Sequence, residues 1–157
     1  MYIQCPDDIS KIHKPIYYRN SIFLAGGITG CDDWQSYVAS KIQGKEVAVV
    51  NPRRVVFDNS ITTEEQVKWE HNAIKMCSYI MFWFTPPTLN PITLFEYGKV
   101  LGDKEGWRAY SIFVGCHPEY ARREDVIVQT KLARPHSRIV VHDNLDDMIK
   151  VINDKFK

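Results

Sequence analysis

Short apolar runs and amphipathic stretches alternate along most of the chain. The apolar runs are rich in β-branched and aromatic residues, which predicts strands covered on both faces, at 21–25, 47–50, 79–84, 111–114 and 138–141. Between them, apolar residues recur at helical spacing over 33–43, 63–77, 94–103, 119–133 and 145–156. Repeated strand–helix units predict an α/β fold with a parallel sheet and helices on both sides.

Polar residues mark two of the predicted helix starts. Thr62, followed three residues later by Glu65, predicts a capping box, and Asn144 predicts the cap of the last helix. The first 20 residues contain Pro6 and Pro15 and fit an additional edge strand and a loop. Because no repeat, low-complexity tract or linker interrupts the pattern, we expect a single domain over 1–157.

Composition narrows the kind of ligand. The 157 residues carry 20 Lys and Arg against 19 Asp and Glu, and this +1 balance gives no electrostatic case for a nucleic acid polymer or a membrane surface. A small molecule is the expected partner. The four cysteines form no C-x-x-C pair, and the chain has no secretory or membrane-spanning apolar segment, so we expect reduced thiols in a cytoplasmic protein.

A carboxylate, Glu96, follows the apolar run 79–84, within the sequence Asn-Pro-Ile-Thr-Leu-Phe-Glu-Tyr-Gly over 90–98. Open α/β sheets place their chemistry at the carboxyl ends of the strands. Glu96 is therefore a candidate nucleophile or base. A second acid, Glu70, lies one helical turn before Ile74 on or beside an apolar helix face, where an acid is either paired or functional.

The run Ile-Phe-Leu-Ala-Gly-Gly-Ile-Thr-Gly over 22–30 leads from a predicted strand into glycines and then a helix. Gly26, Gly27 and Thr29 would let a ligand approach the backbone, where helix-start N–H groups favour an anion or a sugar hydroxyl. The alternative is that the glycines only permit a tight turn. The spacing matches neither a dinucleotide fingerprint nor a P-loop.

Arginines and aromatic residues supply further binding candidates. In Asn-Pro-Arg-Arg over 51–54, we expect one arginine, with Arg53 as the candidate, to face the pocket and the other to be structural. Trp34 and Phe57 are placed to stack on a base, whereas Trp83 is expected in the core. The histidines are isolated, so neither a metal nor another cofactor is expected.

These motifs, together with Glu-Gln-Val-Lys-Trp-Glu over 65–70 and Val-Gly-Cys-His-Pro-Glu-Tyr-Ala-Arg-Arg over 114–123, resemble nucleoside 2-deoxyribosyltransferase-like proteins. The resemblance implies a flavodoxin-like or Rossmann-like three-layer sandwich with a central, mostly parallel five-stranded sheet. It also implies cleavage of the N-glycosidic bond of a 2-deoxynucleoside, and a homo-oligomer in which neighbouring subunits complete the active sites.

The same resemblance assigns roles to residues. The better known transferases carry Asp-x-x-Thr-x-x-Glu-x-Gly with the glutamate as nucleophile, and this chain has Asn90, Thr93, Glu96 and Gly98 at those positions. Glu96 thereby takes the nucleophile role, and Glu70 matches an acidic residue on the preceding helix. Asn90 departs from the pattern, because an amide cannot act as a titrating acid.

Three functions stay open at this point. In the first, the protein transfers the deoxyribosyl group of a 2-deoxynucleoside to another nucleobase or to water, through a covalent intermediate on Glu96. Alternatively, the substrate is a deoxynucleoside monophosphate that the protein hydrolyses as an N-glycosidase, with an anion site at the glycines. As a further alternative, the protein is a catalytically inactive nucleotide-binding module.

Overall fold

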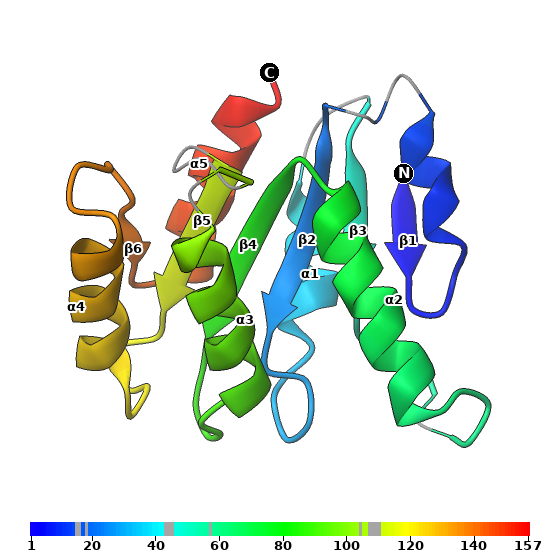
Figure 1. Cartoon of the computed structure of the whole chain (residues 1–157), viewed down its shortest axis with the longest axis horizontal. Coiled ribbons are helices and arrows are strands. Elements are labelled where there is room, and N and C mark those ends of the chain that lie inside the picture. Colours follow the sequence, from blue (N-terminus) through cyan, green and yellow to red (C-terminus); the bar gives the residue numbers. More distant parts are fainter. Residues whose placement is uncertain (15–16, 18, 43–45, 57, 104, 107–110) are drawn as a thin grey trace.

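Six parallel strands form one sheet between two layers of helices in the computed structural model, which describes residues 1–14, 17, 19–42, 46–56, 58–103, 105–106 and 111–157 (Figure 1). The strands are β1 (Tyr2–Gln4), β2 (Ser21–Gly26), β3 (Ala48–Asn51), β4 (Tyr79–Phe84), β5 (Ile112–Cys116) and β6 (Val141–His142). The helices are the 3-10 helix η1 (Ile9–His13) and α1 (Trp34–Lys41), α2 (Thr63–Met76), α3 (Pro91–Gly102), α4 (Arg123–Ala133) and α5 (Leu145–Lys155).

The strand order is β1-β3-β2-β4-β5-β6, and every neighbouring pair is parallel. The predicted three-layer α/β fold is confirmed, with six strands in place of five. The additional strand is β1, which pairs along the open edge of β3 from Tyr2 opposite Val49 to Gln4 opposite Asn51. An edge strand within the first 20 residues was predicted and is confirmed.

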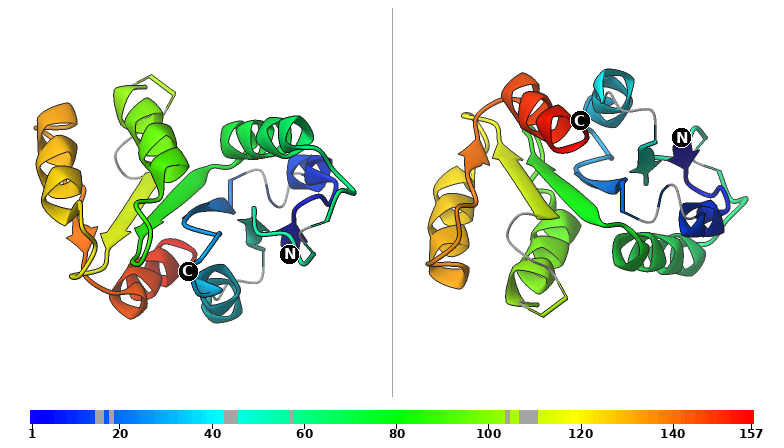
Figure 2. Two further views of the ribbon diagram at one scale, coloured as in Figure 1. Left: turned by 90° about the horizontal axis from the view of Figure 1, so that it is seen from below. Right: turned by 90° about the horizontal axis from the view of Figure 1, so that it is seen from above.

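Both faces of the sheet are covered by apolar contacts, which explains why its strands lack a polar face. Phe23 and Ala25 of β2 pack with η1, α2, α3 and α4, whereas Ile22 and Leu24 pack with α1 and α5 on the opposite face. Figure 2 shows these two helix layers on either side of the sheet. The alternation follows from the two-residue period of a strand.

The predicted caps agree with the structure. Thr62 and Glu65 form the capping box of α2, the side chain of each accepting the backbone N–H of the other. Asn144 caps α5 by accepting the N–H of Asp147. Local polar side chains therefore determine where these two helices begin.

Three predicted boundaries were wrong by several residues. α3 begins at Pro91 instead of residue 94, because proline fits the first helical position, where no N–H needs an intrahelical partner. α4 begins at Arg123 instead of residue 119, after turns in which Tyr120 donates to His117 and Arg123 to Tyr120. The last strand covers Val141–His142, not 138–141, because only these two residues pair with β5. Gln43, the predicted end of α1, lies outside the described residues.

Within the described part of the chain, none of the helices combines the length and the apolar character that crossing a bilayer requires.

Candidate active site

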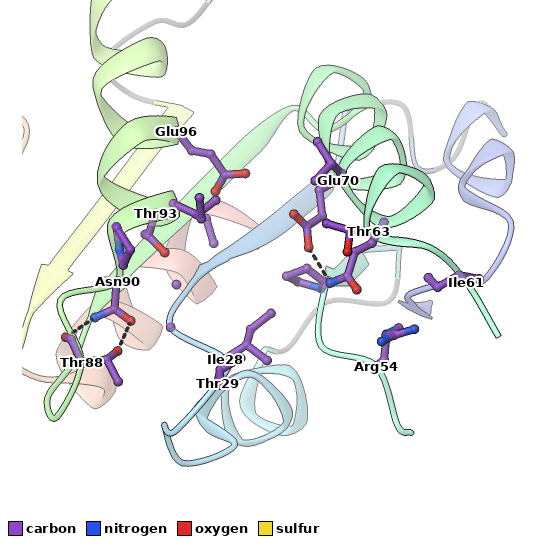
Figure 3. A pocket seen from close by; sticks show the side chains of 18 of the residues that line it. Ile28, Thr29, Arg54, Ile61, Thr63, Glu70, Thr88, Asn90, Thr93 and Glu96 are labelled. Carbon is purple, nitrogen blue, oxygen red and sulfur yellow. Dashed lines mark hydrogen bonds between the residues drawn. The ribbon is translucent and has the colours of Figure 1, made fainter. Parts of the chain in front are cut away.

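A large cavity lies where the sheet topology changes direction. From β2, the chain order runs to β3 on one side and to β4 on the other, and ligands of open α/β sheets bind at such a point, beyond the carboxyl ends of the strands. The cavity has a volume of about 1020 Å³ and opens between α2 and α3 (Figure 3). Its floor includes Phe23 and Ala25 of β2.

The described residues that line the cavity come from the ends of β2 and β3, from α2 and the loop before it, and from the start of α3 and the loop before it. They are Phe23, Ala25, Gly26, Gly27, Ile28, Thr29, Pro52, Arg54, Asp58, Asn59, Ile61, Thr62, Thr63, Gln66, Val67, Glu70, Thr88, Asn90, Pro91, Ile92, Thr93 and Glu96.

One wall of the cavity is the first half of α3. Asn90, Thr93 and Glu96 follow one another at intervals of three residues, so they share one helix face, and all three line the cavity. Thr93 and Asn90 are buried, whereas Glu96 is half-buried. The opposite wall is α2, from which Glu70 and Gln66 line the cavity. Figure 3 shows the two carboxylates pointing into the space between the helices.

Gln66 fixes one oxygen of the Glu70 carboxyl group. Gln66 and Glu70 are four residues apart on α2, and Nε2 of Gln66 donates to Oε1 of Glu70 at 2.9 Å. Because Oε1 already accepts this hydrogen bond, Oε2 is the oxygen better placed to carry a proton.

The surroundings of the two glutamates make both carboxyl groups weaker acids than usual. The pKa of Glu96 is raised to about 7, first by burial and then by the negative charge of Glu70, against a smaller lowering effect of Lys99. Burial also raises the pKa of Glu70, against the stabilising N–H of Gln66. Near neutral pH, the repulsion between two carboxylates therefore favours a pair that holds one proton.

The chain matches a known family over the region that builds this cavity. The model of the family described as "Nucleoside 2-deoxyribosyltransferase like" matches residues 19–120, which is more than half of the chain. The chain belongs to this family. Membership supports an enzymatic role with small-molecule nucleosides as ligands. A search of curated proteins found no match.

The match of the deoxyribosyltransferase-like family includes both walls and the floor of the cavity. Seven of the side chains and glycines that the sequence indicated as site residues line it together: Gly26, Gly27, Thr29, Glu70, Asn90, Thr93 and Glu96. Their individual roles remain predictions. Phe57 lies outside the described residues.

The glycines of the family's first motif are required by packing against protein atoms. A Cβ on Gly26 would lie 2.4 Å from Cζ2 of Trp34 and 2.6 Å from the carbonyl oxygen of Trp83. A Cβ on Gly27 would lie 1.8 Å from Oδ1 of Asn90. Both glycines also line the cavity. The turn therefore packs against protein atoms on one side and borders the cavity on the other.

Trp34 does not line the cavity, which corrects its prediction as a stacking residue. Its side chain is buried, packs against Gly26, and donates from Nε1 to the carbonyl oxygen of Gly27 at 3.0 Å. The indole therefore supports the glycine turn from the side of the sheet that α1 covers. Trp83 is buried in the same core, as predicted.

The choice between the two arginines was also wrong. Arg53 does not line the cavity, and its guanidinium donates to Oε1 of Gln35 and to the carbonyls of residues 28, 31 and 32, while it pairs with Asp33 at 3.3 Å. These contacts use its forked donors to hold the loop after β2. Arg54 is the arginine that lines the cavity. The sequence indicated that one of the two would be structural but not which.

Gln66 and Ile28 are among the lining residues that were not singled out from the sequence. Gln66 lies four residues before Glu70, and this helical spacing could have identified it as a neighbour on the same face. Ile28 lies between two predicted site residues, yet an apolar residue in a loop carries no chemical signal of its own. Among the described residues, no group of three or more His, Cys, Asp or Glu side chains is arranged to hold a metal ion.

Proposed function

We propose that the protein cleaves the N-glycosidic bond of a 2-deoxynucleoside and transfers the deoxyribosyl group to another nucleobase or to water, through a covalent intermediate on Glu96. The observation that carries the proposal is the pair of glutamates on facing walls of the cavity in a deoxyribosyltransferase-like chain. Cleavage with retention needs a nucleophile on one side of the sugar and a proton source near the departing base.

In the first step, an ionised carboxylate oxygen of Glu96 attacks C1′ of the deoxyribose. The electron pair of the C1′–N bond goes to the base nitrogen, which takes a proton from Oε2 of Glu70. The products are a deoxyribosyl ester on Glu96, a free base and an ionised Glu70. The raised pKa of Glu70 suits this role, because the carboxyl group keeps its proton to higher pH than a solvated glutamate does.

In the second step, Glu70 accepts a proton from an incoming base or a water molecule, whose nitrogen or oxygen attacks C1′. The ester bond breaks, its electron pair returns to Glu96, and the starting state of both glutamates is restored. Two displacements at C1′ give overall retention. The remaining lining groups, including Gly26, Gly27, Thr29 and Thr93, are proposed to contact the sugar.

The charges around the cavity favour a nucleoside over a nucleoside monophosphate. Among the described lining residues, Arg54 is cationic, whereas Asp58, Glu70 and Glu96 are acidic. A phosphate dianion would be repelled by ionised acids at these positions. The position of Arg54 in the lining is nevertheless the specific observation in favour of a monophosphate N-glycosidase, which is the second candidate.

The decisive experiment incubates the protein with deoxynucleosides and with deoxynucleoside monophosphates, each with and without an acceptor base, and follows free and exchanged bases by chromatography. We expect base exchange with deoxynucleosides and a mass increase, by one deoxyribosyl group, of the peptide that contains Glu96. Glu96→Gln should lose turnover by at least about a thousandfold. Glu119→Gln, which changes an exposed glutamate outside the cavity, is the matched control.

Each other outcome changes the assignment in a defined way. Release of base from monophosphates alone, with water as acceptor, would move the protein to the monophosphate N-glycosidases. Binding of nucleosides without any released base would identify a binding module. Retained turnover in Glu96→Gln would remove Glu96 from the nucleophile role.

We further propose that a second copy of the chain covers the mouth of the cavity. Val67 and Ile92 line the cavity from opposite walls and are more than half exposed, and Phe95 continues this apolar surface along α3. Exposed apolar side chains that lie together beside a ligand site are typical of a subunit contact.

A further inference from the structure

Asn90 occupies an unusual backbone position at the start of α3. It is the residue before Pro91, its φ and ψ angles are 48° and 54°, and its side chain makes no capping hydrogen bond to the helix. Asparagine is one of the few residue types that adopt this left-handed conformation at low cost. Because the side chain does not cap α3, it is available for contacts with other segments.

Those contacts use both hydrogens of the amide group. Nδ2 of Asn90 donates to the carbonyl oxygens of Thr85 and Thr88, each at 2.9 Å. Oδ1 accepts from the hydroxyl of Thr88 at 3.2 Å and from the thiol of Cys31 at 3.8 Å. The side chain is buried, with 5% of its surface exposed. Both N–H groups of the Asn90 amide therefore donate to protein carbonyls, although Asn90 lines the cavity.

The same side chain brings two distant loops together. Oδ1 of Asn90 lies in the space that a side chain on residue 27 would occupy, since a Cβ there would be 1.8 Å away. The thiol of Cys31 and the hydroxyl of Thr88 also meet at 3.5 Å. One amide group thus links the loop after β2 and the loop after β4 at the N-cap of α3, six residues before Glu96.

We infer that Asn90 is a positioning residue, whose side chain holds the loops after β2 and β4 in the arrangement from which α3 presents Glu96 to the cavity. The role in turnover rests on the proposed function, whereas the role in holding the loops does not. An ionised aspartate could not replace the amide, because it has no donor and would place oxygen 2.9 Å from two carbonyl oxygens.

The kinetic test compares Asn90→Asp and Asn90→Ala with the unchanged protein. Both variants should lower kcat by between about tenfold and a hundredfold, because misplacement of a reacting group acts on the chemical step, while KM stays unchanged. An increase of KM at constant kcat would show that the amide binds substrate instead. A higher kcat in Asn90→Asp would show that an acid at this position serves the leaving base. Either result overturns the inference.

A matched control makes the same chemical change elsewhere. Asn153 on α5 also donates its amide to a backbone carbonyl, that of Lys41, at 3.0 Å, and it does not line the cavity. Asn153→Asp should leave kcat and KM unchanged.

A second measurement tests the loops without any turnover. Cys31 is half-buried against Asn90, whereas Cys77 is buried in the core. Asn90→Ala should increase the rate of alkylation of Cys31 by iodoacetamide several-fold, followed by peptide mass spectrometry, and leave that of Cys77 unchanged. An unchanged rate at Cys31 overturns the inference. If Cys31 is labelled faster in Asn90→Ala but the protein without substitutions releases no base, the role of Asn90 in holding the loops stands. Only the proposed function is then rejected.

Discussion

At the scale of single residues, Glu70 and Glu96 face one cavity and have different proton requirements. The proposed mechanism needs Glu96 ionised and Glu70 protonated before the first step. Burial and mutual repulsion raise the pKa of Glu96 to about 7, and burial raises that of Glu70 as well. Up to about pH 7 the pair therefore holds one proton, and the proposed turnover requires that this proton lie on Glu70.

The pH dependence of turnover follows from this pair. We expect kcat/KM to fall as the pH rises through about 7, because the pair then loses the single proton that the mechanism needs, and to fall at low pH, where both carboxyl groups are protonated. In Glu70→Gln, the negative charge that raises the pKa of Glu96 is absent, so Glu96 should ionise at lower pH and kcat/KM should show no fall near pH 7. The loss of the acid should reduce kcat about a hundredfold or more. A fall of kcat/KM near pH 7 that persists in the variant would contradict the coupling.

Glu96 should also make stability depend on pH. Its folded pKa is raised above the unfolded value of 4.5, so the folded state holds the proton more tightly, and stability falls as the pH rises from about 4.5 through about 7. Glu96→Gln, which stays neutral, should therefore be more stable than the unchanged protein at pH 8. We expect a gain of only about 1–2 kcal/mol, since water partly screens this half-exposed carboxylate. Urea denaturation at pH 8 and pH 4.5 measures the gain, which should vanish at the lower pH.

At the scale of elements, the glycine turn after β2 is held from several sides. Trp34 and Arg53, both predicted to bind the ligand, bond instead to the carbonyl groups of this turn. Asn90, the residue before α3, contacts the loop through the thiol of Cys31. The segment closest to the cavity floor therefore depends on neighbouring side chains, of which Trp34 and Arg53 do not line the cavity.

Substitution of two glycines tests how tightly this turn is packed. Gly27→Ala should destabilise the fold by about 1–3 kcal/mol, because its Cβ would overlap Oδ1 of Asn90. Gly98→Ala is the matched control on α3, where a Cβ meets nothing within 4 Å, and should stabilise the helix by about 0.5–1 kcal/mol. Thermal unfolding measures both changes. A neutral Gly27→Ala would show that the turn has room to move.

At the scale of the whole molecule, the cavity is the gap that two crossover helices leave over one strand. α2 returns the chain from β3 to β4, and α3 continues from β4 to β5, so the two helices lie on one face with β2 beneath the space between them (Figures 1 and 3). Each helix contributes one glutamate. The topology therefore brings together residues that are 26 positions apart in the chain.

Assembly can be tested on the exposed apolar surface of α3. Phe95→Glu should shift the protein to a smaller species in light scattering after size exclusion, because a charge would be buried in the proposed subunit contact. Val151→Glu, on α5 beneath the opposite face of the sheet, is the control and should leave the size unchanged. A protein that is already monomeric before substitution would reject the contact.

The sequence by itself determined the elements and the layers. Apolar runs without a polar face, alternating with helices that have one apolar side, predict a parallel sheet covered on both faces. The helix caps at Thr62 and Asn144 were also predicted from short sequence patterns. Glu96 was also identifiable, because the carboxyl end of a buried strand fixes where an open sheet places its chemistry.

Only the tertiary structure decided which neighbouring side chains face the cavity. Arg54 lines it and Arg53 does not, Trp34 supports the turn, and Asn90 bonds to Thr85 and Thr88. The facing of Glu70 and Glu96 likewise depends on how α2 and α3 pack. The physical reason is that side-chain directions in loops, and hydrogen bonds between segments far apart in the chain, depend on packing that no local period of apolar residues encodes.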